Sequence, residues 1–232
     1  MRVAIMQPYF FPYLGYFQLI GAVDLFIVYD NIKYTKKGWI NRNRILQNGK
    51  DVAFSLPLRN ASDSLHVCQR ELAADFSPQK LLSQIKGTYR RARYFSETYA
   101  LVERICTYDD ANLFRFLHHS LVRVCEHLEI PTRFNISSQI DIDHGLKNQE
   151  KVLALCHAVG GTTYVNSIGG VDLYSKDVFR QEGVDLRFLR ARPFEYRQFG
   201  DAFVPWLSII DVLMFNAPET VRTWVLSGYE LL

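Results

Sequence analysis

The chain has 232 residues, of which 48% are hydrophobic, 14% aromatic and 22% charged. This is the composition of a globular protein, and it excludes a disordered, collagen-like or coiled-coil chain. The 27 basic and 24 acidic residues leave a formal net charge of +3. That excess is too small to indicate a nucleic-acid or membrane partner.

The four cysteines (Cys68, Cys106, Cys125 and Cys156) are scattered and form no CxxC pair. We expect them to be buried, reduced thiols in a reducing compartment. The N-terminus lacks the apolar core of a signal peptide, and no apolar run approaches the ~18–20 residues of a membrane-spanning helix. The sequence therefore predicts a cytoplasmic protein with no membrane span.

The first 30 residues predict a β-α-β unit, with strands at 3–6 and 25–29 and a helix at 14–23. The first strand is followed directly by Gln7, and the second is followed by Asp30. In open α/β sheets the ligand crevice lies beyond the carboxyl ends of such strands. We therefore expect both side chains at the edge of the sheet where a ligand binds.

The rest of the chain continues the alternation of strands and helices. We expect strands at 52–56, 163–166 and 186–189, helices at 79–94, 98–108, 112–128 and 150–159, an apolar run at 203–215 and a helical C-terminus. The sequence thus predicts a single α/β domain over residues 1–232. Its sheet is expected to be Rossmann-like and mostly parallel, with a helix-rich insertion near 77–130.

The segment from Met6 to Phe17 is rich in aromatic residues and contains two prolines and one glycine. Its composition alone fits a rigid core patch. A binding role is favoured because Gln7 follows a buried strand and because the prolines fix a loop whose tyrosines, Tyr9 and Tyr16, could stack on a base or a sugar ring.

The region from Asn31 to Lys50 contains six basic residues and no acidic one. Lys37 and Arg42 are suited to phosphate oxygens, Trp39 offers a flat face, and Asn41 could read a hydroxyl. A solvated basic loop anchored by the tryptophan is the simpler interpretation. Interleaved basic and aromatic residues also fit single-stranded nucleic acid, which the small net charge and the absence of an RNA-binding signature disfavour.

Five stretches of the sequence resemble the WbqC-like protein family: Gln7–Phe17, Asp30, Lys37–Arg44, Tyr196–Gln198 and Phe203–Asp211. The resemblance extends from Met1 to about Asn216. It implies a cytoplasmic bacterial protein that is associated with the biosynthesis of O-antigen (part of lipopolysaccharide) and of other surface polysaccharides. Transfer of glycine or another acyl group to an amino sugar, which has been proposed for members, is the activity it implies.

A second, weaker similarity concerns the HxGH nucleotidyltransferases. Pro12-Tyr13-Leu14-Gly15-Tyr16 has the spacing of their motif, with tyrosines in place of both histidines. Tyrosine is neutral near pH 7 and supplies a hydrogen-bond donor but no cation. The similarity therefore implies a Rossmann-like fold and nucleotide binding, and it does not support nucleotidyl transfer.

Three residues are candidates for proton transfer. Asp30 at a strand end could orient Lys37 or accept a proton from a substrate amine. Asp211 lies in an apolar run, where burial would raise its pKa unless it is paired. A structural carboxylate is an equal alternative there. His144 is the best candidate for a histidine base, and its neighbours Asp141 and Asp143 are too weak a pattern to predict a metal site.

Glycine pairs and polar residues surround the predicted strand at 163–166. Tyr164, Asn166 and Tyr174 are candidates for substrate contact, and Gly169 and Gly170 would allow close approach of the backbone to a ligand. Asn166 or the backbone amides of the glycine pair could form an oxyanion site. The sequence has no GxxxxGK[ST], GxGxxG or GxSxG motif. This excludes the common classes of ATPase, dinucleotide-binding protein and hydrolase that carry these motifs.

Together these features predict an N-acyl or glycyl transferase that modifies a nucleotide-linked amino sugar. No cofactor is firmly implied, although the reaction requires an activated acyl or glycyl donor, with an acyl-donor or carrier protein as a further partner. Two alternatives stay open. One is a nucleotidyltransferase-like enzyme, and the other is a noncatalytic protein that binds nucleic acid or a protein partner.

Overall fold

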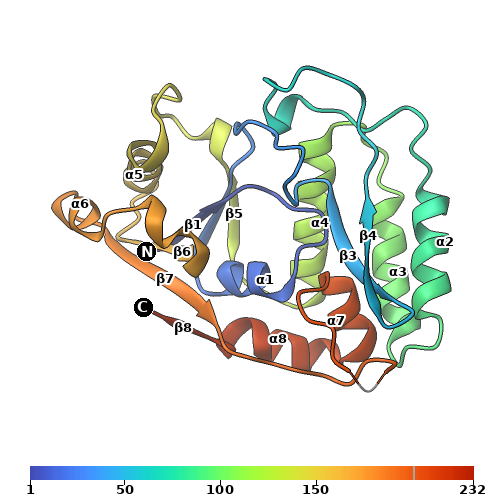
Figure 1. Cartoon of the computed structure of the whole chain (residues 1–232). Helices are drawn as coiled ribbons and strands as arrows, with labels where there is room; N and C mark the ends of the chain where they lie inside the picture. Colours follow the sequence, from blue (N-terminus) through green and yellow to red (C-terminus); the bar gives the residue numbers. More distant parts are fainter. Residues whose placement is uncertain (201) are drawn as a thin grey trace.

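A six-stranded sheet forms the centre of this computed structural model, which describes residues 1–200 and 202–232 (Figure 1). Its strands are, in spatial order, β5 (Arg133–Ile136), β2 (Leu25–Val28), β1 (Arg2–Met6), β6 (Thr163–Ser167), β7 (Asp185–Ala191) and β8 (Tyr229–Leu231). The first five are parallel, and β8 pairs with β7 antiparallel. Numbered along the chain, these six strands have the order 3-2-1-4-5-6 of the Rossmann fold. The predicted α/β fold class is confirmed.

Helices cover both faces of the sheet. They are α1 (Leu14–Gly21), α2 (Pro78–Tyr89), α3 (Phe95–Cys106), α4 (Leu113–His127), α5 (Asn148–Ala158), α6 (Lys176–Gln181), α7 (Ile209–Phe215) and α8 (Pro218–Ser227). Val3 and Ile5 of β1 pack with residues of α5 and α6, whereas Ala4 packs with residues of α1, α4 and α8. A strand buried on both faces reads as a continuous apolar run, which is why this one could be predicted.

The chain between β2 and β5 forms the part drawn on the right of Figure 1. It consists of the hairpin β3 (Arg42–Gln47) and β4 (Lys50–Ser55), followed by α2, α3 and α4. Apolar residues of these helices, such as Ile85 and Ile105, share one buried cluster with Val28 of the sheet. The hairpin and helices are therefore packed on the sheet through a continuous core.

The main departures from the sequence-based expectation are the unpredicted strands β3, β5 and β8, the unpredicted short helix α6 and the end of α2. The expected helix over 79–94 ends at Tyr89, because the backbone turns there and the Tyr94 amide instead donates to the Met214 carbonyl at 3.1 Å. β3 was expected as part of a basic loop, since its alternating polar residues lack the β-branched pattern of a strand. β5 and β8 are short edge strands, which give little sequence signal.

All four cysteines are free thiols, with Cys106, Cys125 and Cys156 buried and Cys68 half-buried. Burial raises the pKa of Cys106 and of Cys156 to about 12, so both thiols are protonated near neutral pH. Within the described part of the chain, no helix combines the length and the apolar character needed to cross a membrane.

Candidate functional site

Three segments cross beside the carboxyl edge of the sheet: the loop after β1, strand β3 and the segment before α7. The Asn43 side chain, which is buried, donates from Nδ2 to the carbonyls of Phe10 at 3.2 Å and Phe11 at 2.9 Å. The buried Ser208 hydroxyl donates to the Phe11 carbonyl at 2.8 Å. Two side chains thus satisfy the carbonyls of a loop that has no regular secondary structure, and we call this crossing the three-segment junction.

Backbone hydrogen bonds complete the junction. The Ser208 amide donates to the Arg44 carbonyl and the Ile209 amide to the Pro12 carbonyl, both at 2.9 Å. Phe11 has a φ of 42° and Trp206 a φ of 61°, in the left-handed region that bulky residues rarely occupy. Such conformations cost on the order of 1–3 kcal/mol each and persist where the surrounding contacts enforce them. The junction supplies those contacts.

A cavity of about 460 Å³ opens next to the junction, and we call it the large cavity. It lies between the first turn of α1, the end of β7 and the segment that leads to α7. The volume falls within the roughly 300–1,000 Å³ of small-molecule sites. Its aromatic walls come from Tyr13, Phe194, Tyr196, Phe203 and Trp206.

Positive charge faces the large cavity from two sources. Leu14 and Gly15, at the N-terminal end of α1, line it, and helix N-termini favour anions. Arg192 lines the opposite wall and forms no ion pair with any residue that the structure describes. Glu195, also at the wall, is the acidic residue of the lining. The arrangement suits a ligand with an anionic group and an apolar or planar part.

A smaller cavity of about 180 Å³ adjoins the large one, and we call it the tryptophan cavity. Tyr13 and Trp206 line both cavities, and their ring centroids are 5.9 Å apart in an edge-to-face arrangement. The remaining walls are formed by Tyr9, Trp39, Asn43 and Arg44. Burial raises the pKa of Tyr9 and of Tyr13, which keeps both phenols protonated near neutral pH.

The basic segment before β3 uses two of its predicted ligand-binding residues to hold its own conformation. Asn41 accepts from the Tyr34 hydroxyl and donates to the Leu56 carbonyl, each at 2.8 Å. Arg42 donates to carbonyls of its own loop, with Nη2 2.6 Å from the Lys37 oxygen. The Lys37 side chain is exposed. Trp39 lies under the guanidinium groups of Arg42 and Arg44, whose central carbons are 5.9 and 5.1 Å from its ring.

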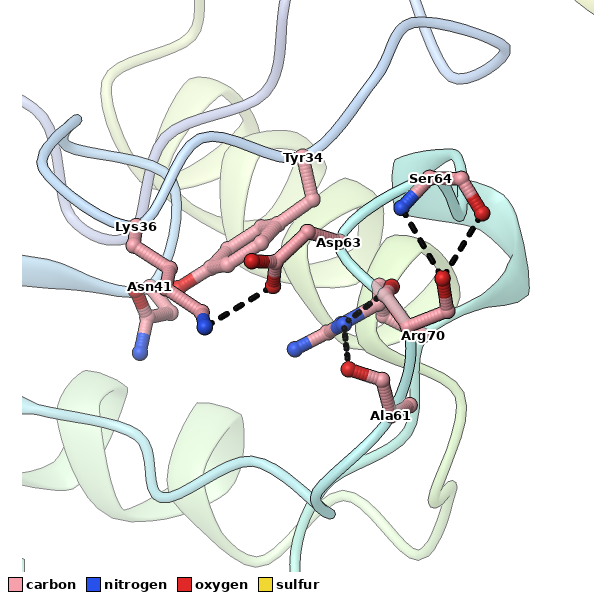
Figure 2. Close-up of polar contacts among 8 residues, drawn as sticks. Tyr34, Lys36, Asn41, Ala61, Asp63, Ser64 and Arg70 are labelled. Atoms are coloured by element: carbon pink, nitrogen blue, oxygen red, sulfur yellow. Dashed lines mark hydrogen bonds and ion pairs between the residues drawn. The ribbon is translucent and has the colours of Figure 1, made fainter.

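Figure 2 shows a second cationic cluster at the base of this segment. The buried Arg70 guanidinium lies 4.6 Å from the Tyr34 ring and donates to the Ser62 carbonyl at 3.0 Å. Lys36 pairs with Asp63 at 2.9 Å between exposed side chains, and a hydrogen bond from this lysine is the main reason that the Asp63 pKa is lowered. Arg70 thus ties the loop around residue 62 to the basic segment.

Asp30 and His144 are brought together at the carboxyl ends of β2 and β5. Asp30 is buried and accepts from the amide and hydroxyl of Ser138 at 2.9 and 2.6 Å. The next residue, Asn31, bonds to Nδ1 of the exposed His144 at 2.9 Å. Lys151 is buried beside them, and its burial lowers its pKa. Among the described residues, no three His, Cys, Asp or Glu side chains converge as metal ligands would.

Asp211 lies apart from this pair, fully buried at the start of α7. It accepts from the hydroxyls of Tyr89 at 2.8 Å and Tyr196 at 2.6 Å, and from the Gln198 amide at 2.8 Å. Burial raises the Asp211 pKa, and these three donors oppose the shift. Tyr196 lines the large cavity, so its hydrogen bond to Asp211 helps to orient one wall of that cavity. Both oxygens of Asp211 already accept hydrogen bonds from the protein, so neither is free for a substrate.

The predicted residues after β1 form a local network. The Gln7 side chain donates to the Tyr9 hydroxyl at 2.7 Å, and the Tyr16 hydroxyl donates to the Gln7 carbonyl at 2.9 Å. Tyr16 is buried, so it supports the loop from beneath. Tyr9 is the member of this group that reaches a cavity.

The predicted residues in and after β6 start from the strand itself, which contains Tyr164 and Asn166. The buried Asn166 side chain accepts from the Ser167 amide at 2.9 Å, and its Nδ2 would be 2.4 Å from a Cβ at Gly170. A side chain at 170 would therefore displace the Asn166 amide, whereas Gly169 is exposed with open space around it. Tyr164 is buried, with its hydroxyl 3.5 Å from that of Tyr174.

None of the predicted site residues lines the large cavity, and Tyr9 and Trp39 are the two that line the tryptophan cavity. The residues missed include Tyr13 and Trp206, which each follow a proline, and that rigid position was the available signal. Arg44 was found as part of the basic segment, whereas Arg192 gives no signal of its own, since tertiary structure alone places it beside the aromatic rings.

Replacing Asn43 tests the three-segment junction. We expect Asn43→Ala to lower the free energy of unfolding by about 1–3 kcal/mol, because two buried carbonyls lose their donor. Urea unfolding measures this, with Asn60→Ala at an exposed position as the matched control, expected within about 0.5 kcal/mol of the wild type. Equal stability of the two variants would contradict the role of Asn43.

The raised pKa of Asp211 predicts a pH dependence of stability. The folded state favours the protonated carboxyl, so this stabilisation is complete below the ordinary aspartate pKa of about 4 and is lost as the pH rises through the raised value. Asp211→Asn does not titrate, so its unfolding free energy relative to wild type should improve with pH across that window. Urea unfolding at a series of pH values measures this, and a difference that stays constant would refute the assigned direction.

Comparison with known proteins gives one family and one curated relative. The WbqC-like protein family matches residues 7–223. A Mycobacterium tuberculosis protein, named "Uncharacterized protein Rv1507c", is 28% identical over 229 residues, which cover 95% of this chain and 97% of that protein. No solved structure matches the chain. The family match includes the three-segment junction and both cavities, and the chain belongs to the WbqC-like protein family.

Proposed function

We propose that this protein binds a nucleotide-linked amino sugar and transfers an acyl or glycyl group to its amine, as a step in surface-polysaccharide biosynthesis. The observation that carries the proposal is the large cavity, which combines aromatic walls with Arg192 and the N-terminal end of α1. A nucleotide-linked sugar has the matching parts, because it joins planar and partly apolar rings through a diphosphate.

The place of the cavity in the fold supports a phosphate there. In Rossmann folds the helix after the first strand points its N-terminus at the ligand phosphates. Here that helix is α1, and Leu14 and Gly15 of its first turn line the large cavity. The Arg192 guanidinium can then form two hydrogen bonds to phosphate oxygens.

The acid–base groups lie farther along the same edge. β1 and β6 separate β2 from β7, so the carboxyl ends of those two strands are about 14 Å apart at the usual strand spacing. A substrate whose diphosphate occupies the large cavity would direct its sugar along this edge, past Gln7 and Asn166. The amine would then approach Asp30 and His144.

In the transfer step, the sugar nitrogen forms a bond to the acyl carbon, the leaving group of the activated donor departs, and the amine proton passes to the base. Both candidates are already hydrogen-bonded: the Asp30 oxygens accept from Ser138, and His144 has Nδ1 2.9 Å from Asn31 and Nε2 3.1 Å from the Ile140 carbonyl. His144 is the better base because it is exposed, and it would exchange its bond to the Asn31 side chain for one to the amine. The Asn166 amide or the backbone around Gly169 would stabilise the negative oxygen of the intermediate.

Thermal unfolding against a ligand panel tests the binding part of the proposal. The panel contains UDP-, dTDP- and GDP-linked amino sugars, the free sugars, coenzyme A thioesters and a short oligonucleotide. A ligand at about 100 times its Kd adds roughly 2.7 kcal/mol of stability, which gives a measurable shift in Tm. We expect one nucleotide-linked sugar to stabilise the protein, and Arg192→Ala to reduce that shift.

Arg187→Ala is the matched control, because it removes an exposed arginine from β7, the strand that ends just before Arg192, at a position that lines neither cavity. Mass spectrometry of the stabilising sugar with an acyl donor then detects transfer as an added acyl mass. Stabilisation by the oligonucleotide alone, or by no member of the panel, would contradict the proposed function.

A further inference from the structure

We propose that the tryptophan cavity receives a pyrimidine ring that carries carbonyl oxygens, as uracil and thymine do, with Trp206 stacked on it. The inference rests on the proposed function for the presence of a nucleotide, and it adds the class of base. The two cavities share Tyr13 and Trp206, so a base in the smaller one continues directly into a diphosphate in the larger one.

The size of the tryptophan cavity supports a single ring. Its 180 Å³ are well below the roughly 300–1,000 Å³ of a pocket for a complete ligand. Four of its six lining residues are aromatic: Tyr9, Tyr13, Trp39 and Trp206. A small space between flat side chains favours a flat fragment, and a pyrimidine is the smallest nucleobase.

Trp206 has the features of a side chain that stacks on a ligand. Its indole is 64% exposed, although it is a large apolar group, and its backbone is in the left-handed region. Large exposed aromatic groups and strained backbone are both concentrated at functional sites. Trp39, on the other side of the cavity, is 40% exposed and is held by Arg42 and Arg44.

The polar groups of the cavity point to carbonyl oxygens on the ring. Arg44 Nη1 bonds to Asp51 at 2.8 Å and its Nε is buried away from solvent, whereas Nη2 makes no hydrogen bond to a described residue and is the nitrogen left to donate. The Tyr9 hydroxyl accepts from Gln7 and keeps its own proton to donate.

Of the other polar side chains of the cavity, the Tyr13 hydroxyl makes no hydrogen bond to a described residue, whereas Asn43 is already engaged. Its Nδ2 donates to the loop carbonyls of the junction, and its Oδ1 accepts from the Arg44 amide. The cavity therefore offers unused donors. A ring carbonyl satisfies such a donor, whereas the exocyclic amino group of cytosine would leave two donors facing each other.

Calorimetric titration of the wild-type protein with UDP and CDP tests the class of base without any substitution. The two ligands differ at C4, where a carbonyl oxygen is exchanged for an amino group, and at N3, which donates in uracil and accepts in cytosine. We expect UDP to bind more tightly than CDP and than GDP. Equal or tighter binding of CDP or GDP would overturn the proposed base preference.

Substitution of Trp206 tests the stacking. We expect Trp206→Ala to weaken UDP binding by about 5- to 150-fold, the range for one stacked base, and Trp206→Phe to weaken it less. Tyr108→Ala is the control, because this aromatic residue is exposed and lines neither cavity, and circular dichroism checks that each variant is folded. Unchanged UDP binding by a folded Trp206→Ala protein would overturn the stacking.

Titration with the nucleotide-linked amino sugar separates the two proposals. If it binds wild type and Trp206→Ala equally, the base site is wrong and the proposed function stands. If neither it nor UDP binds the wild-type protein, the proposed function fails, and the base site fails with it.

Discussion

The buried amide of Asn43 and the buried hydroxyl of Ser208 hold the arrangement on which both cavities depend. They bond to the carbonyls of Phe10 and Phe11, in a loop that is neither helix nor strand. Because unpaired buried carbonyls are costly, these donors fix where the loop passes and how the hairpin and the segment before α7 meet it. Trp206, which lines both cavities, lies two residues before Ser208.

This arrangement divides the polar residues into two groups. Asp211 and Asn41 are bonded to protein donors or acceptors, so they determine the shape of the site. The Arg192 guanidinium and Nη2 of Arg44 make no hydrogen bond to a described residue, so they are available to a ligand. We therefore infer that the residues without protein partners recognise the ligand, and that the residues already bonded to the protein position the walls of the site.

The sequence predicted the fold better than it predicted the site. The apolar run from Val3 to Met6 is buried on both faces, which gives a strong local signal, and the Rossmann-like sheet follows from several such runs. The basic segment was found as a cluster, but its composition does not reveal that Arg42 bonds to its own loop. Arg44 and Trp206 are 162 positions apart in the chain, and only the junction places them in one cavity.

A crystal structure of the protein with a bound UDP- or dTDP-linked amino sugar would locate each part of the ligand in the site. We expect the diphosphate to contact the first turn of α1 and Arg192, with the base between Trp39 and Trp206. Density for the diphosphate beside Lys36 and Arg70, or beside Asp30 and His144, would contradict this expectation. In either of those cases the aromatic cavities would have to serve a different ligand.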